Sequence, residues 1–214
     1  NFKLRNDGQV KLMHGVGIDP KEYGIGDFDR DKYREELGVD KEDFVLLILA
    51  ELNKNKNHIQ VIKAMEILKG KYPSIKVLCA GKGPLENELK GTVSKMNLEE
   101  NIKFIGFRND IKELLYSCDC IGLFSKREGL GKCLLEGMVA SKCLIATNTR
   151  GPKELIKNEK NGFLVEVGDY KQTAEYVEVI YLNTERRKEL IDNSKKRVSN
   201  YYIDNVLCEI SRFY

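Results

Sequence analysis

The chain has 214 residues, of which 42% are hydrophobic and 32% are charged, and its formal net charge at pH 7 is +3. This composition is that of an ordinary globular domain, and the small, evenly spread positive excess argues against nucleic acid as a main partner. No apolar run approaches the roughly 20 residues that a bilayer-spanning helix needs, and no signal peptide is recognisable at the start.

The cysteines and histidines indicate reduced thiols and no metal site. Most of the six cysteines lie in apolar runs, where a free thiol behaves as a small buried hydrophobe. There is no C-x-x-C pair, and the two histidines, His14 and His58, lack the spacing of zinc ligands and an identifiable nucleophile partner. We therefore predict a cytoplasmic protein with no metal and no cofactor, and we assign neither histidine a catalytic role.

In chain order, the first part, Asn1 to Asp19, reads as a polar lead with a short strand at 10–13 and a turn at Gly15 and Gly17. Apolar runs and amphipathic segments then alternate. We expect strands at 44–50, 75–80, 102–105, 118–124, 143–146 and 162–165, and helices at 28–37, 59–68, 84–96, 110–116, 132–140 and 152–157. From 170 to the end the pattern is helical, in three pieces divided near Asn183 and Asn200. This alternation predicts an α/β fold with a doubly wound, Rossmann-like parallel sheet.

The most informative stretch runs from Cys118 to Ala146 and reads as strand, glycine-bearing turn, helix and strand. Glu128 lies in the turn and Glu136 lies inside the helix. The turn falls where parallel sheets bind ligands, and a helix N-terminus suits phosphate. A carboxylate farther along the helix could accept hydrogen bonds from ribose hydroxyls. The residues alone leave a second interpretation open, in which both glutamates are solvated and the glycines only form the turn.

Two other loops are weaker candidates. Lys54 and Lys56 follow the most hydrophobic strand, and either could pair with a diphosphate, although a solvated basic loop is the plainer interpretation. Gly81-Lys82-Gly83 lacks the full dinucleotide fingerprint, so we interpret it first as a turn and second as a cleft wall.

Taken together, these motifs resemble a known family. The stretch FSKREGLGKCLLEGMVASKCLIATNTRGPKELI, followed by NGFLVEVGD, is similar to the donor-binding half of the retaining glycosyltransferases of group 1, family 4. Earlier parts match in the family's order: GVGID, LAELNKNKNH, VLCAGKGP and NIKFIGFRNDIKELLYSCDC. The resemblance covers about Val10 to Tyr214 and is strongest to the bacterial capsule, exopolysaccharide and lipopolysaccharide members.

The resemblance implies the GT-B fold, in which two Rossmann-like domains enclose the active site. Residues 1–214 would be the C-terminal, nucleotide-sugar binding domain, with 170–214 a helical tail and the N-terminal acceptor domain absent. The start at Asn1, without an initiator Met, agrees with that expectation. The implied activity is transfer of a hexose from a UDP-sugar to a glycan or lipid-linked acceptor with retention of configuration. The fragment alone would be inactive, and association with the inner face of the membrane would come through the missing half.

The resemblance also assigns roles to particular residues. Glu128 would contact hydroxyls of the donor sugar as the catalytic candidate, Glu136 would bind the ribose, and Lys56 would bind the diphosphate. The remaining donor contacts would be the backbone amides near the first helical turn and the segment beside the base, which are Gly129, Leu130 and Gly131, and Phe107 and Arg108.

The chain also departs from the family pattern. Glu51 stands where the family has its diphosphate arginine, so Asn53 or Lys54 would have to supply the missing contact. Gly137 and the sequence Ser141-Lys142-Cys143 replace the usual Ala and Gly-x-Pro, which we interpret as packing changes. Two alternatives remain open: a non-catalytic nucleotide- or sugar-binding module, and a UDP-sugar epimerase of the same fold. A dehydrogenase is disfavoured because the dinucleotide fingerprint is incomplete.

Overall fold

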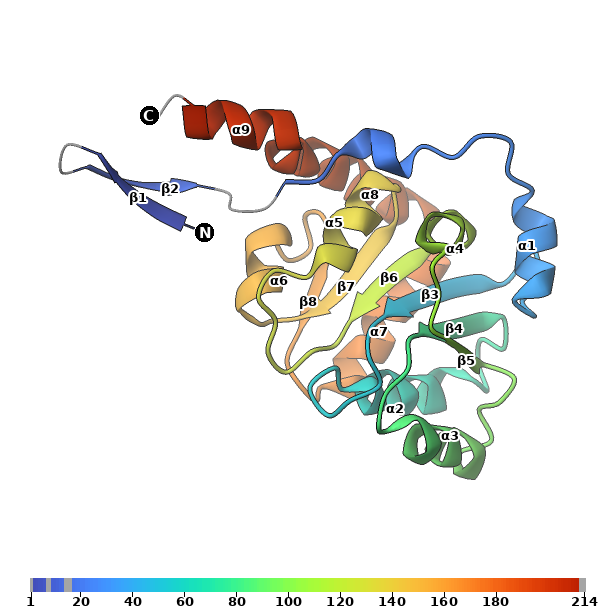
Figure 1. The fold of residues 1–214 in the computed structure, drawn as a ribbon. Coiled ribbons are helices and arrows are strands. Elements are labelled where there is room, and N and C mark those ends of the chain that lie inside the picture. The colour runs from blue at the N-terminus through green and yellow to red at the C-terminus, as the bar shows by residue number, and fades with distance from the viewer. Residues whose placement is uncertain (1, 7–8, 14–16, 212–214) are drawn as a thin grey trace.

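The computed structural model describes residues 2–6, 9–13 and 17–211, and its centre is a six-stranded parallel sheet (Figure 1). Its strands are β3 (Phe44–Leu49), β4 (Ile75–Ala80), β5 (Ile102–Gly106), β6 (Cys120–Leu123), β7 (Cys143–Thr147) and β8 (Phe163–Val165). They lie in the order β5-β4-β3-β6-β7-β8. Successive strands therefore wind outward in one direction from β3 and in the other from β6, which is the doubly wound arrangement. The predicted parallel sheet is confirmed.

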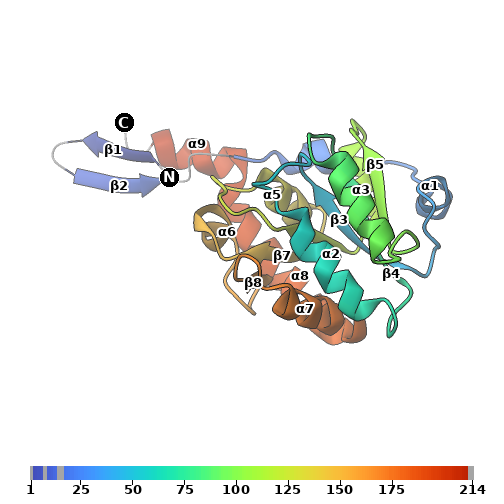
Figure 2. The ribbon, with the colours of Figure 1, turned by 90° about the horizontal axis from the view of Figure 1, so that it is seen from below.

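Helices cover both faces of this sheet, which explains why β3 is apolar throughout. Phe44, Leu46 and Ile48 pack into one cluster and Val45 and Leu47 into the other. The first cluster includes α2 (His58–Leu68), α3 (Glu86–Lys95) and α7 (Tyr170–Leu182), seen together in Figure 2. The second includes α4 (Ile111–Ser117), α5 (Lys132–Val139) and α6 (Arg150–Leu155), while α8 (Thr184–Val198) contributes to both. A strand covered on both faces gains from apolar residues at every position.

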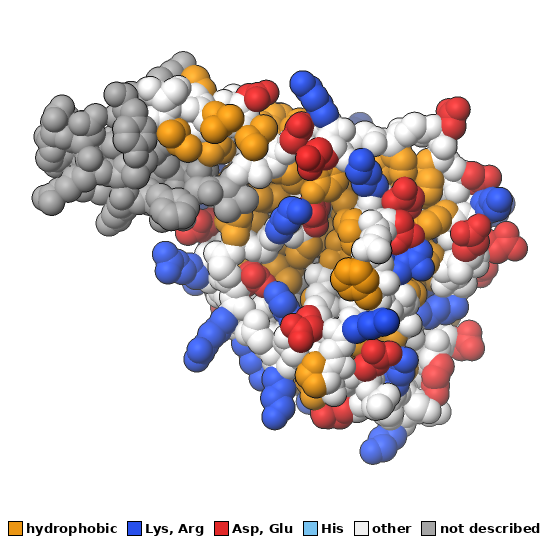
Figure 3. Space-filling model, in the orientation of Figure 1, with side chains coloured by type: hydrophobic (Ala, Val, Ile, Leu, Met, Phe, Trp, Pro, Cys, Tyr) orange, Lys and Arg blue, Asp and Glu red, His pale blue; other side chains and the backbone are white. Residues whose placement is uncertain are grey.

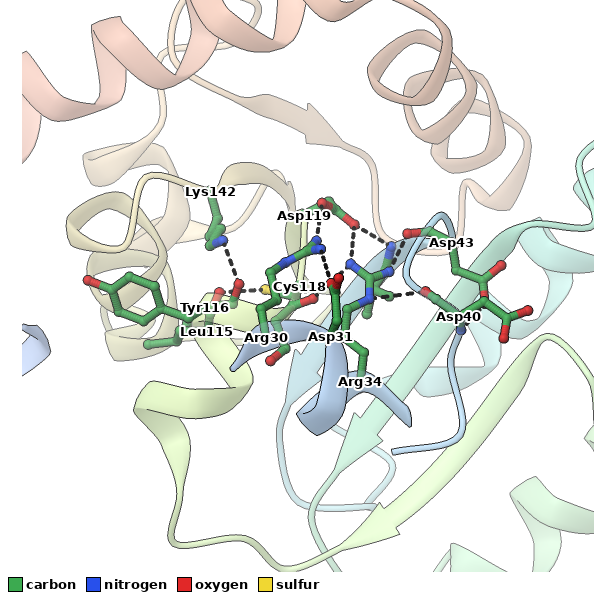
Figure 4. Close-up of polar contacts among 12 residues, drawn as sticks. Arg30, Asp31, Arg34, Asp40, Asp43, Leu115, Tyr116, Cys118, Asp119 and Lys142 are labelled. Carbon is green, nitrogen blue, oxygen red and sulfur yellow. Dashed lines mark hydrogen bonds and ion pairs between the residues drawn. The ribbon is translucent and has the colours of Figure 1, made fainter. Parts of the chain in front are cut away.

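Helix α1 (Arg30–Glu36) is fixed to the sheet by a buried arginine (Figure 4). Arg34 is fully buried and donates hydrogen bonds to the backbone carbonyls of Asp40, Asp43 and Ser117. Its guanidinium also lies 3.7 Å from the carboxylate of Asp119, which in turn accepts the Val45 N–H at 2.8 Å. Burying an arginine is tolerated only when its donors are satisfied, so this network fixes the position of α1 against the start of β3 and β6.

The segment around Ile18 lies beside the segment around Tyr201 (Figure 1). Ile18 donates its N–H to Tyr201 O at 2.8 Å and accepts the Ile203 N–H at 3.1 Å. Tyr201 ends the short helix η2 (Ser199–Tyr201), and α9 (Ile203–Ser211) follows it. Figure 3 shows hydrophobic side chains gathered over α9. This helix carries two large exposed hydrophobic residues, Ile203 and Leu207, which are 41% and 56% exposed. None of the helices in the described part of the chain combines the length and apolarity of a bilayer-crossing segment.

Some predicted elements were wrong. The polar lead contains a strand that we did not expect, because β1 (Phe2–Asn6) pairs antiparallel with β2 (Gln9–Met13). The turn η1 (Pro20–Tyr23) was also missed. The predicted turn at Gly15, like His14, lies outside the described residues. The strand predicted from 118 begins only at Cys120, and α3 begins at Glu86 rather than at Pro84. The three helical pieces of the tail are confirmed, with Asn183 and Asn200 at their boundaries.

Candidate functional site

The loops that follow β3 and β6 meet at the point where the strand order reverses. Lys126 donates its backbone N–H to Asn55 O at 2.8 Å. The Asn55 side chain donates to Arg127 O at 3.0 Å and accepts the Arg127 N–H at 3.1 Å. In open parallel sheets, ligands bind in the crevice that this reversal leaves at the carboxyl ends of the strands. The hydrogen bonds therefore join the two rims of the expected binding crevice into one unit.

An ion pair joins the two rims through residues that the sequence singled out. Lys56 Nζ lies 2.7 Å from Glu128 Oε2, with the side chains 25% and 17% exposed. The same carboxylate accepts hydrogen bonds from Ser125 Oγ at 3.1 Å and from Gly129 N at 3.2 Å. The lysine and the glutamate are separated by 72 positions in the sequence. The structure thus brings the predicted diphosphate lysine and the predicted sugar-binding glutamate into direct contact.

Helix α5 begins at this crevice without a side-chain cap. Its N-cap residue is Gly131, with φ +88°, and no side-chain hydrogen bond caps the helix within the part of the chain that the structure describes. A Cβ at Gly131 would lie 2.8 Å from Leu123 Cδ2, so both the backbone angle and the space favour glycine. At Gly129 a Cβ would meet nothing within 4 Å, so close packing does not require that glycine. The open N–H donors and the positive helix end suit an anionic group.

Glu136, one turn farther along α5, is buried and held by two donors. Tyr23 Oη donates to Glu136 Oε1 at 3.0 Å, and Lys132 Nζ lies 3.4 Å from the same oxygen. Burial, together with the charge of Glu136, raises the pKa of Tyr23 well above its ordinary value, so the hydroxyl remains a donor. Tyr23 comes from η1, and sequence reasoning missed it because a tyrosine 113 positions away from its partner leaves no local pattern.

One glutamate, Glu128, lies just before α5, and the other, Glu136, lies inside it. Burial first, and then the negative charges of Glu136 and Glu128, raise the pKa of the Cys133 thiol to about 12. One side chain on α5 therefore senses both carboxylates. Among the described residues, no group of three or more His, Cys, Asp or Glu side chains is arranged to hold a metal ion.

A pocket of about 500 Å³ lies beside the ends of β3, β4 and β5. Among the lining residues are the two predicted base contacts, Phe107 and Arg108, and Glu51, which stands where the family has an arginine. The full lining is Leu49, Ala50, Glu51, Ala80, Gly81, Lys82, Phe107, Arg108 and Ile111. Phe107 is 67% exposed and so offers an uncovered ring. The interpretation of the Gly81–Gly83 turn as a cleft wall is consistent with this pocket.

Arg108 is fixed in this pocket by its neighbours. Its guanidinium forms a two-pronged ion pair with Asp110 and donates to Tyr33 Oη at 3.2 Å. The Asp110 hydrogen bonds raise the pKa of Arg108, against the opposing effect of burial. Glu51 accepts a hydrogen bond from Asn53 Nδ2 at 2.9 Å at the same edge. Asn53 is therefore engaged by Glu51.

His58, which we left without a catalytic role, is a buried group at the start of α2. Neither ring nitrogen has a hydrogen-bond partner within the described residues, and the side chain is 1% exposed. Burial, together with the nearby charge of Lys56, lowers the pKa of His58 to about 4. The imidazole is therefore neutral near pH 7.

Comparison with known proteins identifies a family with these features. The model of the family "Glycosyl transferases group 1" matches residues 29–197. The chain is 34% identical over 211 residues to EpsD of Bacillus subtilis, whose name assigns it provisionally to the glycosyltransferases. That match covers 98% of this chain and 55% of EpsD. The chain spans about half the length of the curated relatives that it matches.

Two solved structures share the fold. The Anabaena protein Alr3699/HepE, crystallised with UDP and also with UDP-glucose, is 25% identical, and in the UDP complex its TM-score is 0.84 over 92% of this chain and 55% of its own. The C-terminal domain of LpcC from Francisella tularensis, a glycosyl transferase group 1 family protein, is 24% identical. Its TM-score is 0.78 over 87% of this chain and 100% of that domain. The predicted fold class, a Rossmann-like half of the GT-B fold, is confirmed.

Proposed function

The chain belongs to the group 1 glycosyl transferases, and on that premise we propose that it is the donor-binding domain of a two-domain GT-B enzyme. The whole enzyme transfers a hexose from a UDP-sugar to a glycan or lipid-linked acceptor with retention of configuration. The absent N-terminal domain binds the acceptor, so this chain alone binds the donor without completing the transfer. We also propose that the whole enzyme acts at the cytoplasmic face of the membrane.

The observation that carries the proposal is the Lys56–Glu128 pair at the start of α5. A nucleotide sugar is a diphosphate joined to a sugar on one side and a nucleoside on the other. Here a cation and the uncapped N–H groups of α5 lie next to a carboxylate, at the crevice where parallel sheets bind ligands. The UDP and UDP-glucose complexes of the Anabaena protein support a donor of this chemical class.

Each part of the donor has a matching group in this crevice. Lys56 and the α5 N–H groups stabilise the negative charge that develops on the leaving diphosphate, which is the large electrostatic contribution in such transfers. Glu128 accepts hydrogen bonds from sugar hydroxyls and orients the reacting carbon. Glu136 accepts from the ribose hydroxyls. The pocket beside Phe107 and Arg108 receives the base.

Glu51 cannot bind the diphosphate, so other groups must do so. A carboxylate repels phosphate, and Asn53 already donates one of its side-chain N–H groups to Glu51 at 2.9 Å. Lys54 is exposed, and no hydrogen bond or ion pair of its side chain is recorded among the described residues. The proposal therefore assigns the diphosphate to Lys56 and the helix start, with Lys54 the remaining cation on the loop.

Calorimetric titration of this chain with UDP, GDP and ADP tests the proposal. We expect UDP to bind with preference, and Glu136→Ala to weaken it by about 5- to 150-fold, the effect of losing hydrogen bonds to a charged group. Saturating titrations that show no binding of any of the three would contradict a donor site here. In the whole enzyme, NMR of the product's anomeric carbon distinguishes retention from inversion. A product that is epimerised or hydrolysed UDP-sugar, with no sugar transferred to an acceptor, would contradict the proposed transfer.

A further inference from the structure

We propose that Tyr23 is a positioning residue that aims the carboxylate of Glu136 at the ribose of the nucleotide. The inference rests on the proposed function, because it deepens the role assigned there to Glu136. Tyr23 lies in η1, on the segment that joins the β1–β2 hairpin to α1, and not on any element of the sheet crevice.

The contact leaves one carboxylate oxygen available. Tyr23 Oη donates to Glu136 Oε1 at 3.0 Å, and the contact of Lys132 is with that same oxygen. Within the described residues, no hydrogen bond to Oε2 of Glu136 is recorded. A carboxylate held through one oxygen presents the other in a fixed direction, as a hydroxyl-bearing ligand requires. The tyrosine thus restricts the rotation of Glu136 without using all of its acceptor capacity.

Tyr23 is better suited to this task than Lys132. The Lys132 side chain is 75% exposed, so water and salt weaken its pair with Glu136. Tyr23 is 7% exposed, and an aromatic side chain has few rotatable bonds. Its hydroxyl also remains protonated, since burial raises its pKa. The hydroxyl therefore remains a hydrogen-bond donor to Glu136 near neutral pH.

The backbone around Tyr23 is itself fixed. Tyr116 Oη, at the end of α4, donates to the carbonyl of Tyr23 at 3.0 Å. The side chain of Asp19 accepts the Lys21 N–H at 2.9 Å and so caps η1. Before η1, Ile18 is hydrogen-bonded to the C-terminal segment. These contacts, to the carbonyl of Tyr23 and to the residues just before it, hold the tyrosine in place beside α5.

The test measures recognition of the ribose rather than affinity in general. UDP and 2′-deoxy-UDP are titrated calorimetrically against the chain and its Tyr23→Phe variant, and the readout is the ratio of the two Kd values. Glu136→Gln reports whether the carboxylate reads the ribose at all. Tyr72→Phe is the matched control, because Tyr72, in the turn between α2 and β4, donates from Oη to the Glu178 carboxylate on α7 at 2.5 Å, and neither residue belongs to the crevice.

We expect the unmodified chain to prefer UDP and Tyr23→Phe to reduce that preference by about five- to tenfold, with 2′-deoxy-UDP binding unchanged. Tyr72→Phe should keep the full preference, even if both tyrosine variants lower the Tm equally. A Tyr23→Phe variant that keeps the preference, or weakens both nucleotides equally, overturns the positioning role. If it does so while Glu136→Gln abolishes the preference, the proposed function stands. If the unmodified chain binds UDP without preference over 2′-deoxy-UDP, the ribose role of Glu136 fails, and the role of Tyr23 with it.

Discussion

Lys56→Met is the substitution that tests the proposed diphosphate site most directly. The lysine is 2.7 Å from Glu128 and three-quarters buried. Methionine keeps much of the side-chain length and removes the charge. The fold should tolerate the change, because Glu128 retains its hydrogen bonds from Ser125 and from the backbone N–H of Gly129.

The size of the expected loss of UDP binding follows from how deeply Lys56 and Glu128 are buried. Two unit charges about 4 Å apart interact by roughly 4 kcal/mol at an effective dielectric constant of about 20. Exposure of 25% for Lys56 and 17% for Glu128 lets water reduce this. We therefore expect UDP binding to weaken by about 2 kcal/mol, or about 30-fold. UMP lacks the second phosphate and should weaken by about threefold or less.

The assay is calorimetric titration of UDP and UMP with Lys56→Met, Glu128→Gln and the double variant. Removing the lysine leaves the Glu128 carboxylate unpaired beside the diphosphate, so the second substitution should restore about 1 kcal/mol of UDP binding. Equal losses for UMP and UDP would refute the assignment of Lys56 to the diphosphate. A double variant no better than Lys56→Met would refute the coupling through Glu128.

Further predictions concern stability and metal dependence. The folded-state pKa of His58, about 4, lies below its ordinary value of 6.5, so its contribution to the free energy of unfolding is complete above pH 6.5 and is lost as the pH falls to 4, by about 3 kcal/mol. Urea unfolding should show that His58→Leu removes this pH dependence, and equal slopes in both proteins would contradict it. Gly131→Ala should lower the free energy of unfolding by about 1–3 kcal/mol, because of its positive φ and the contact with Leu123. Gly129→Ala should change it by less than about 0.5 kcal/mol, and equal effects of the two substitutions would contradict the reasoning. Finally, EDTA should leave the Kd for UDP unchanged, and a tenfold loss would reveal a metal that we do not expect.

The sheet was predictable because its strands carry strong local signals. The run Ile75–Ala80 is apolar except for Lys76, and the observed strand β4 has the bounds that the run predicts. The helix ends were predictable where a residue tolerates a left-handed backbone. Asn97, directly after the helix predicted at 84–96, has φ +49°, and Gly38, directly after the helix predicted at 28–37, has φ +70°. Such features depend on a few neighbouring residues, which is why composition and spacing reveal them.

The errors fall where pairing outweighs local preference. The polar segment Phe2–Asn6 has a weak strand pattern of its own, and it is a strand because Gln9–Met13 lies opposite. Cys118 and Asp119 precede an apolar run and were predicted to belong to its strand. Cys118 instead ends α4, and Asp119 donates its backbone N–H to Val45 O ahead of β6. Local sequence does not contain the partner that decides these cases.

For the site, the sequence alone determined the glycine-bearing turn with Glu128, the helix that carries Glu136 and the loop that holds Lys56. These are properties of short segments, set by turn chemistry and helical periodicity. Only the tertiary structure decided that Lys56 pairs with Glu128 across 72 positions, and that Tyr23 holds Glu136 across 113. Those contacts exist because β3 and β6 are paired in the sheet and because the segment that carries Tyr23 packs beside α5. Their energy therefore depends on how distant segments pack, which no local pattern contains.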